Sequence, residues 1–327
     1  MPAEVRLVES QVQGFHALSL KNPILSLTMI PELGGKISSI RDLRTNREWL
    51  WNNAHLPYRH HVYGTSYIQE ADTGGWDECF PTVAECSYPS EPWKGLRMPD
   101  HGEIWPNSWA AKVEGNASTQ LSISTEVQGV ALPYEFRRTI SLHANSPTVR
   151  FDYSVRSLAD SALNYIWSAH PLFVVEPGMQ ILLPEDTPMR AWSSFPPGFV
   201  SDKEEHIWPV HAKANGNELD LSHMPNTTAG IACKLWSQSL SQGYAALVAK
   251  DGEFRFTFDP IILPQVGLWV NAGGWSGTGG EPYYNLALEP CIGAQDSLEE
   301  AVEHYRQYKT LPAHEVHTWW LEVHLHQ

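Results

Sequence analysis

The stretch YNLALEPCIGAQDS, residues 284–297, carries a carboxylate at the end of an apolar segment. Alternate side chains of an extended backbone point to opposite faces, so Glu289 lies on one face and Leu286 and Leu288 on the other. Pro290 has no N–H to donate to a sheet, and we expect the strand to end there. The sequence therefore predicts a carboxylate at the rim of a β-sheet.

A short helix is predicted directly after this strand. Ser297 and Glu300 have the spacing of a capping box, in which each side chain accepts a hydrogen bond from the other residue's backbone N–H. The pattern predicts a helix that runs to about Tyr308. Glu289 is thus expected between the end of a strand and the start of a helix.

Most of the remaining chain has the pattern of short strands separated by Gly, Pro and Asn. Apolar runs and partial period-two alternation predict strands at residues 23–30, 35–42, 121–124, 134–142, 148–155, 163–167, 231–236, 244–249, 253–258, 266–271 and 317–325. The strands within residues 108–157 are expected to be antiparallel neighbours. Helical periodicity is scarce outside the segment after Asp296, so the fold class is all-β.

Two segments lack regular patterning. Residues 184–226 are rich in turn signals. Residues 52–109 are dense in aromatic side chains, which predicts an ordered loop region folded over one sheet edge rather than disorder. No repeat of fixed period and no low-complexity linker divides the chain. We therefore expect residues 1–327 to form one large β domain.

The composition restricts the partners. The 22 Lys and Arg against 37 Asp and Glu give a net charge of -15, which disfavours nucleic acids and anionic membranes. Residues 1–10 lack the apolar core of a secretory signal, and no run approaches membrane-spanning length, so we expect a soluble cytoplasmic protein. The four scattered cysteines are expected to be reduced thiols, without a metal or disulfide role.

Two histidines are candidates for acid/base chemistry. His101 lies between Asp100 and Gly102, and His170 follows the predicted strand at residues 163–167. An imidazole exchanges a proton near neutral pH, as a general acid or base requires. The alternative for His101 is a turn residue that only hydrogen-bonds locally, and for His170 a core histidine satisfied by a backbone carbonyl.

Glu289 is interpreted as a general base, because an apolar strand precedes it and Pro290 follows it. The alternative is a structural salt bridge. Acid and base groups at strand ends are sufficient for the rearrangement of a hemiacetal, so no cofactor and no metal is predicted.

Two glycine-rich stretches, at residues 72–78 and 268–275, combine Trp with hydrogen-bonding side chains. Carbohydrate sites use aromatic faces together with carboxylates and amides that bind the sugar hydroxyls. We therefore interpret six side chains as candidate substrate-binding groups: Trp76, Asp77, Glu78, Trp269, Asn271 and Trp275. The alternative is a pair of glycine-rich loops with buried Trp. Neither stretch has the spacing of a phosphate-binding loop, and no Gly-x-Ser-x-Gly elbow is present.

Four motifs in the correct order resemble the aldose 1-epimerase family, also called galactose mutarotases, and the chain looks most like its poorly characterised mutarotase-related branch. The motifs are LGGKISSI at 33–40, DHG at 100–102, NYIWSAH at 164–170, and LEP at 288–290 with DS at 296–297. The resemblance implies a large antiparallel β-sandwich of the galactose mutarotase type, a supersandwich, with few short helices.

The resemblance also implies the roles of three residues. In this family the residue matched by His170 acts as general acid toward the ring oxygen, and the residue matched by Glu289 acts as general base toward the anomeric hydroxyl. The residue matched by His101 helps to hold the ring oxygen. The family's substrate-binding Arg has no counterpart, and Asp77 and Glu78 occupy its region. A further family Asp has only Asp251 and Asp259 as candidates.

The sequence thus predicts a cofactor-independent isomerase that interconverts the α and β anomers of an aldose. A non-catalytic carbohydrate-binding protein of the same fold is the first alternative, and a glycoside lyase or hydrolase is the second. The absence of a second carboxylate in a paired motif argues against the second alternative. The expected partner is a small-molecule carbohydrate, with a neutral sugar ahead of a phosphorylated one because no Arg cluster is present. The oligomeric state is not predicted.

Overall fold

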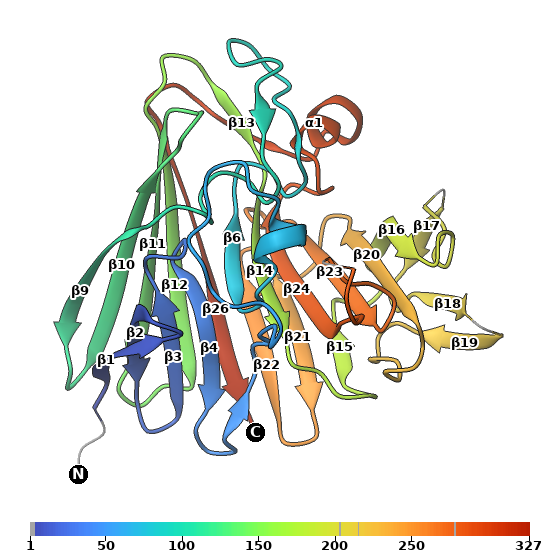
Figure 1. Ribbon diagram of the computed structural model, residues 1–327, viewed down its shortest axis with the longest axis horizontal. Helices are drawn as coiled ribbons and strands as arrows, with labels where there is room; N and C mark the ends of the chain where they lie inside the picture. Colours follow the sequence, from blue (N-terminus) through green and yellow to red (C-terminus); the bar gives the residue numbers. More distant parts are fainter. Residues whose placement is uncertain (1–3, 203, 215, 278) are drawn as a thin grey trace.

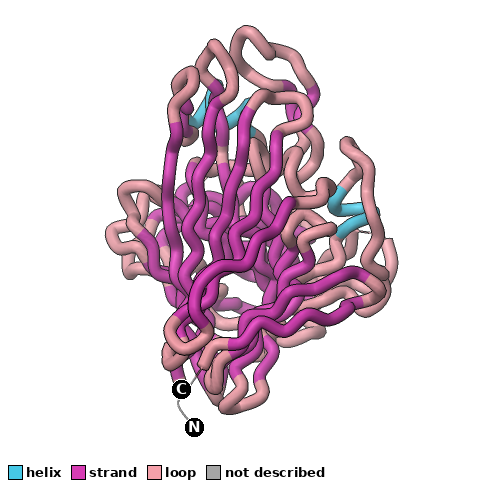
Figure 2. The backbone as a smooth tube through the Cα atoms, turned by 90° about the vertical axis from the view of Figure 1, so that its left-hand side faces the viewer, coloured by secondary structure: helices cyan, strands magenta, loops and turns pink. Residues whose placement is uncertain are grey.

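The computed structural model describes residues 4–202, 204–214, 216–277 and 279–327 as a β-sandwich of two large antiparallel sheets (Figure 1). Strands make up about half of the backbone, and the loops gather at the strand ends (Figure 2). Within these ranges no helix has the length and apolar character needed to cross a membrane. The all-β fold class predicted from the sequence is confirmed.

The larger sheet has 12 strands within the described residues. Eleven of them follow one another in the order β1 (Arg6–Val12), β2 (Phe15–Lys21), β3 (Leu25–Ile30), β4 (Lys36–Asp42), β6 (Trp76–Cys79), β14 (Trp167–Phe173), β24 (Tyr284–Ile292), β23 (Gln265–Ala272), β20 (Ile231–Ser237), β16 (Pro188–Phe195) and β17 (Glu205–Ile207). The short strand β5 (Arg47–Glu48) pairs with β4.

The smaller sheet has eight strands in the same described part of the chain. Their order is β15 (Gln180–Leu182), β21 (Tyr244–Ala249), β22 (Gly252–Phe258), β26 (Val316–His326), β12 (Thr148–Ser157), β11 (Tyr134–His143), β10 (Gln120–Gln128) and β9 (Ala110–Asn116). The antiparallel neighbours predicted within residues 108–157 are confirmed as β9 to β12.

The remaining elements are short. Three two-stranded ribbons pair β13 (Leu163–Tyr165) with β25 (Lys309–Leu311), β18 (His211–Ala214) with β19 (Asn217–Asp220), and β7 (Cys86–Ser87) with β8 (Arg97–Met98). The helical turns are η1 (Tyr67–Ala71), α1 (Leu298–Glu300) and η2 (Ala301–Tyr305). The predicted helix after Ser297 is confirmed, since the Ser297 hydroxyl accepts a hydrogen bond from the Glu300 backbone N–H, but the helical turns end at Tyr305 rather than Tyr308.

Aromatic side chains fill the space between the two sheets. The ring of Trp76 on β6 packs against Phe151 of β12 at a centroid distance of 4.7 Å, and Trp167 of β14 packs against Trp319 of β26 at 5.1 Å. Both Trp side chains are buried. Because alternate residues of a strand face opposite ways, the neighbours of Trp76 and Trp167 point to the other face of the large sheet.

Pro290 does not end its strand, which corrects the prediction, because β24 continues through it. The ladder between β24 and β14 is interrupted there. Ser168 pairs with Cys291 on one side of the gap, and Leu172 pairs with Ala287 on the other. The missing N–H of Pro290 falls in this gap, so no ladder hydrogen bond is lost.

Two predictions for the irregular segments are also corrected. Residues 184–226 contain β16 to β19, and β16 belongs to the large sheet. Its register shifts between Ala191 and Ser193, and such a bulge hides the period-two pattern. Residues 52–109 are mostly irregular, but β6 within them lies at the centre of the large sheet, between β4 and β14. A strand of four residues is too short to show its period.

Glu78, on the same side of β6 as Trp76, points between the sheets and forms a buried ion pair. Its carboxylate accepts hydrogen bonds from Arg138 of β11 at 2.9 Å, from the Tyr153 hydroxyl at 3.0 Å and from the Trp167 indole N–H at 2.9 Å. The side chains of Glu78 and Arg138 are both 0% exposed. This ion pair ties the two sheets together in the core.

Replacing Arg138 is expected to destabilise the protein strongly. Arg138→Met leaves the Glu78 carboxylate buried without its counter-ion, which costs about 3–5 kcal/mol of unfolding free energy. The neighbouring Arg137 pairs with Glu126 and is 52% exposed, so Arg137→Met is the matched control, with a loss of about 0–1 kcal/mol. Urea denaturation followed by tryptophan fluorescence measures both. Equal stability of the two variants would contradict this account of the core.

Candidate active site

A cavity of about 230 Å³ opens on the face of the large sheet that is turned away from the smaller sheet. Its ionisable lining consists of carboxylates, imidazoles and one ammonium, contributed by Asp72, His101, His170, Lys234, Glu289 and Asp296. The rest of its wall is mainly apolar and aromatic, contributed by Tyr67, Ile68, Val83, Leu172, Phe195, Trp269 and Trp275. The three residues to which the resemblance assigns catalytic roles therefore share one cavity.

Strand alternation brings Glu289 into this cavity. Leu288 belongs to the core between the sheets, and Glu289 points the opposite way with its side chain 0% exposed. Gly267 of β23 is the residue directly across the ladder. A Cβ atom at Gly267 would lie 2.6 Å from Oε2 of Glu289, so only glycine leaves room for the carboxylate.

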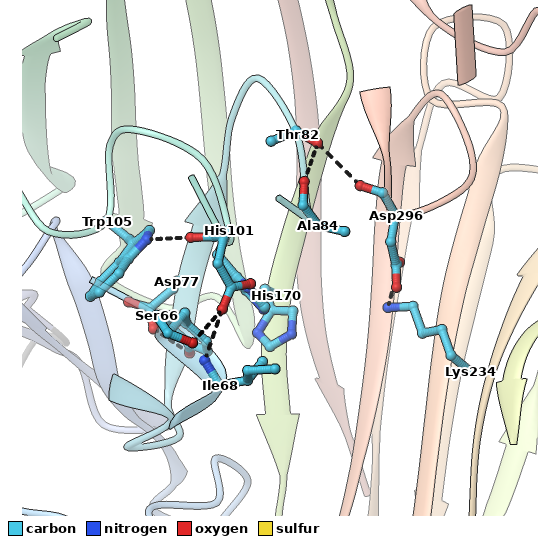
Figure 3. Close-up of polar contacts among 12 residues, drawn as sticks. Ser66, Ile68, Asp77, Thr82, Ala84, His101, Trp105, His170, Lys234 and Asp296 are labelled. Atoms are coloured by element: carbon cyan, nitrogen blue, oxygen red, sulfur yellow. Dashed lines mark hydrogen bonds and ion pairs between the residues drawn. The ribbon is translucent and has the colours of Figure 1, made fainter. Parts of the chain in front are cut away.

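Lys234 of β20 is the counter-ion of this carboxylate. Its Nζ pairs with Oε2 of Glu289. The same Nζ lies 3.8 Å from Oδ1 of Asp296 (Figure 3). The ammonium also lies over the ring of Trp236, 4.6 Å from its centroid. Burial alone would lower the pKa of Lys234, but the charges of Glu289 and Asp296 raise it above its ordinary value. A buried carboxylate needs such a partner to remain charged.

Lys234 is not among the residues predicted from the sequence, although the sequence holds a signal for it. It is the one charged residue in the otherwise apolar run at residues 231–236. An ammonium at the centre of a buried strand requires an anionic partner, and the pattern alone does not say which carboxylate supplies it.

His101 is fixed by its sequence neighbours on both sides. Asp100 Oδ1 lies 2.7 Å from Nδ1 of His101. The other oxygen of Asp100 accepts hydrogen bonds from the Ser66 hydroxyl at 3.2 Å and from the Ile68 backbone N–H at 3.1 Å, just before and within η1. His101 has a left-handed backbone with a φ of 60°. A Cβ atom at Gly102 would lie 2.1 Å from the carbonyl oxygen of Phe80, which explains the glycine of the motif.

His170 lies between His101 and Glu289. Its Nε2 is 3.6 Å from Oε1 of Glu289, and its ring meets that of His101 edge to face at a centroid distance of 4.9 Å. Burial lowers the pKa of His170 well below its ordinary value, and the positive charges of His101 and Lys234 act in the same direction. Burial alone would also lower the pKa of His101, but the Asp100 carboxylate raises it above its ordinary value. The surroundings therefore favour the protonated form of His101 and the neutral form of His170.

Asp77 supports the site without lining the cavity. Its carboxylate pairs with Lys36 and accepts a hydrogen bond from the Tyr67 hydroxyl at 2.7 Å. The Tyr67 ring stacks on His101 at a centroid distance of 4.0 Å. Asp77 thus holds the aromatic ring that covers one side of His101.

The other predicted binding residues divide into two groups. Trp269 and Trp275 line the cavity, with ring centroids 5.4 Å apart. Asn271 does not line it, because its amide donates to the carbonyl oxygen of Trp275 at 3.0 Å and so holds the turn that presents this Trp. Trp76 and Glu78 point between the sheets, away from the cavity, because their stretch is a strand of the large sheet rather than a loop.

The two candidates for the additional family Asp lie elsewhere. Asp251 accepts a hydrogen bond from Arg47 at 2.6 Å, and Asp259 accepts one from the backbone N–H of Ile261 at 2.9 Å. Neither lines the cavity. Asp72 and Asp296 do line it. Asp72 begins the glycine-rich stretch at residues 72–78 but is not among the six candidate side chains, and Asp296 is only part of a motif match.

Several buried polar atoms of the cavity wall have no hydrogen-bond partner among the described residues. They are Oδ1 of Asp72, Nδ1 of His170, Oε1 of Glu289 and Oδ1 of Asp296. Leaving such an atom unsatisfied costs about 1–3 kcal/mol. A ligand rich in hydroxyl groups would satisfy these atoms, and the Trp rings offer flat faces to its C–H groups.

Comparison by sequence finds no match, neither to a protein-family model nor to a curated protein. Comparison by structure does find similar folds. The chain is 14% identical to the Slr1438 protein of Synechocystis sp. PCC 6803, with a TM-score of 0.67, and the match covers 98% of this chain and 96% of that one.

Two further solved structures are galactose mutarotase-like proteins. The protein from Clostridium acetobutylicum is 10% identical, with a TM-score of 0.64 and coverage of 99% of both chains. The protein from Lactobacillus casei ATCC 334 is 16% identical, with a TM-score of 0.62 and coverage of 95% of this chain and 100% of that one. At these identities the likeness concerns the fold alone. The chain therefore has the β-sandwich fold of galactose mutarotase-like proteins.

Proposed function

We propose that the protein is an aldose 1-epimerase, a mutarotase that interconverts the α and β anomers of an aldose without a cofactor. The observation that supports this proposal most directly is that Glu289, His170 and His101 line one cavity. The unpartnered acceptor atoms and the paired Trp rings of the same cavity suit a sugar.

The reaction needs one base, one acid and room for a rotation. Glu289 takes the proton of the anomeric hydroxyl as an imidazole gives a proton to the ring oxygen. The bond between C1 and the ring oxygen breaks, its electron pair goes to that oxygen, and C1 becomes the carbonyl carbon of the open-chain aldehyde. After rotation about the bond from C1 to C2, the same steps in reverse close the ring on the other face of the carbonyl.

The electrostatics favour His101 as the imidazole that gives the proton. The pKa of His101 is raised by Asp100, whereas burial lowers that of His170. The resemblance implies the opposite assignment, with His170 as the acid. In our proposal His170 stays neutral, contacts Glu289 and hydrogen-bonds the sugar through the nitrogen that has no partner in the described residues.

Removing the base is expected to abolish the exchange of anomers. Glu289→Gln keeps the shape of the side chain but cannot accept the proton, so kcat falls by about 10²–10⁴-fold. Polarimetry and NMR exchange spectroscopy on a panel of pure aldose anomers measure the rate, and circular dichroism checks the fold. Glu315→Gln, at an exposed position, is the matched control and keeps full activity.

A wild-type protein that accelerates no anomer exchange on a broad panel would contradict the proposal. Sugar binding measured by calorimetry in that protein would then point to the non-catalytic binding alternative.

The pH profile separates the two histidines. A general acid must carry its proton, so kcat falls as the pH rises through the pKa of the acid. With His101 as the acid this decline lies above pH 6.5, since Asp100 raises its pKa from that value. Asp100→Asn removes the carboxylate and shifts the decline to lower pH. A wild-type decline that lies below pH 6.5, unmoved by Asp100→Asn, would instead assign the acid to His170, whose pKa is lowered.

A further inference from the structure

Asp72 is a buried carboxylate in the wall of the cavity with no role in the acid/base steps. The residue is 6% exposed. In the described part of the chain no group donates a hydrogen bond to its carboxylate, Oδ1 is buried without a partner, and no ion pair includes it. Asn53 holds the backbone of this segment in place. Its Nδ2 donates to the carbonyl oxygen of Asp72 at 3.1 Å, and its backbone N–H donates to the carbonyl oxygen of Thr73 at 3.0 Å.

Asp72 lies on the His101 side of the cavity, because it directly follows η1, whose Tyr67 stacks on the His101 ring. The charges that act on its carboxyl are those of His101, Lys36, Asp77 and Asp100. The pair of Lys234 and Asp296 lies on the opposite side of His170 from His101 (Figure 3). Burial raises the pKa of Asp72 to about 6, against the attraction of His101 and Lys36, so a carboxylate remains the main form at neutral pH.

The proposed acid and base determine the orientation of a pyranose between these two sides of the cavity. The ring oxygen faces His101 and His170, and the anomeric hydroxyl at C1 faces Glu289. The two carbons bonded to the ring oxygen point away from each other, so C5 and its substituent C6 point away from Glu289. On the proposed function, this orientation directs C6 to the His101 side of the cavity. Asp72, with its unpartnered Oδ1, belongs to the cavity wall.

We propose that Asp72 is a specificity-determining residue that accepts a hydrogen bond from the C6 hydroxyl of a free hexose and excludes the hexose 6-phosphate. This inference rests on the proposed function. A hydroxyl donates to a carboxylate, and a charged hydrogen bond of this kind is stronger than a neutral one. A phosphate at C6 would bring a charge of about -1.5 to -2 against the carboxylate.

No cation of the described cavity wall is free to receive such a phosphate. Lys234 is paired with Glu289, and His101 is paired with Asp100. Lys36, the lysine whose charge acts on Asp72, is paired with Asp77. No arginine lines the cavity. The substrate class is therefore an uncharged hexose with a free C6 hydroxyl.

The experiment compares wild type with Asp72→Asn on three forms of one hexose: the free sugar, its 6-deoxy analogue and its 6-phosphate. Anomer exchange is measured by NMR for the glucose and galactose series, and kcat and KM are determined separately. Asp160→Asn is the matched control, because the side chain of Asp160 is 100% exposed and lies outside the cavity. Melting temperatures check that each variant is folded.

For the free hexose, Asp72→Asn is expected to raise KM by about 5-fold to 10-fold and to change kcat little, because the amide oxygen accepts only a neutral hydrogen bond in place of the charge-assisted one. Wild type loses at least this factor on the 6-deoxy analogue, on which the variant has no further effect. Wild type also disfavours the 6-phosphate, and the variant reduces that discrimination.

Two results would overturn the inference: an equal effect of Asp72→Asn on the free and 6-deoxy sugars, or a wild-type preference for the 6-phosphate. If wild type exchanges no anomers, the proposed function fails by itself, and calorimetric binding of the same three sugars tests Asp72 separately. Absence of both binding and exchange for all of them would also reject the inference.

Discussion

The structure depends on one constraint, which is that the central strands of the large sheet are buried on both faces. Strands β14 and β20 are buried at every described position. Such strands usually read as continuous apolar runs. Here one face packs aromatic residues against the smaller sheet, while the other carries His170, Lys234 and Glu289. The two faces therefore have opposite chemistry on the same short stretch of backbone.

The polar face is stable only because its charges compensate one another. Lys234 joins two carboxylates, Glu289 of β24 and Asp296 of the segment between β24 and α1. The ladder between β14 and β24 is interrupted where Pro171 and Pro290 lie, and His170 and Glu289 sit in the same gap. The prolines that interrupt the ladder thus coincide with the place where His170 and Glu289 meet. Gly267 completes this arrangement by leaving space for the carboxylate.

Much of the fold could be predicted from the sequence, because most strands are long enough to show apolar runs or alternation. The predictions miss β1 and β2, which lie before the first predicted strand. They also fail where the period is hidden: in β6, which has four residues, and in β16, which contains a bulge. The same cause explains the site residues. Trp76 and Glu78 read as loop residues because β6 was too short to reveal its two faces.

The motifs indicated His101, His170 and Glu289, since each stands beside a glycine or proline with a structural reason to be there. Lys234 and Asp72 have no directly adjacent glycine or proline that would indicate a site in the sequence. Their importance arises from partners that are distant in the sequence, or from the lack of a partner. Only the folded chain shows which side chains meet across the sheet.

The two oxygens of Asp100 bind two different elements. Oδ1 contacts the imidazole of His101, and Oδ2 accepts a hydrogen bond from the Ile68 backbone N–H of η1. Any movement of η1 away from the cavity would therefore break hydrogen bonds to the carboxylate that orients His101. The position of η1 in the cavity wall and the orientation of His101 are thus coupled. In the proposed mechanism, the acid would be aligned only while η1 stays in the cavity wall.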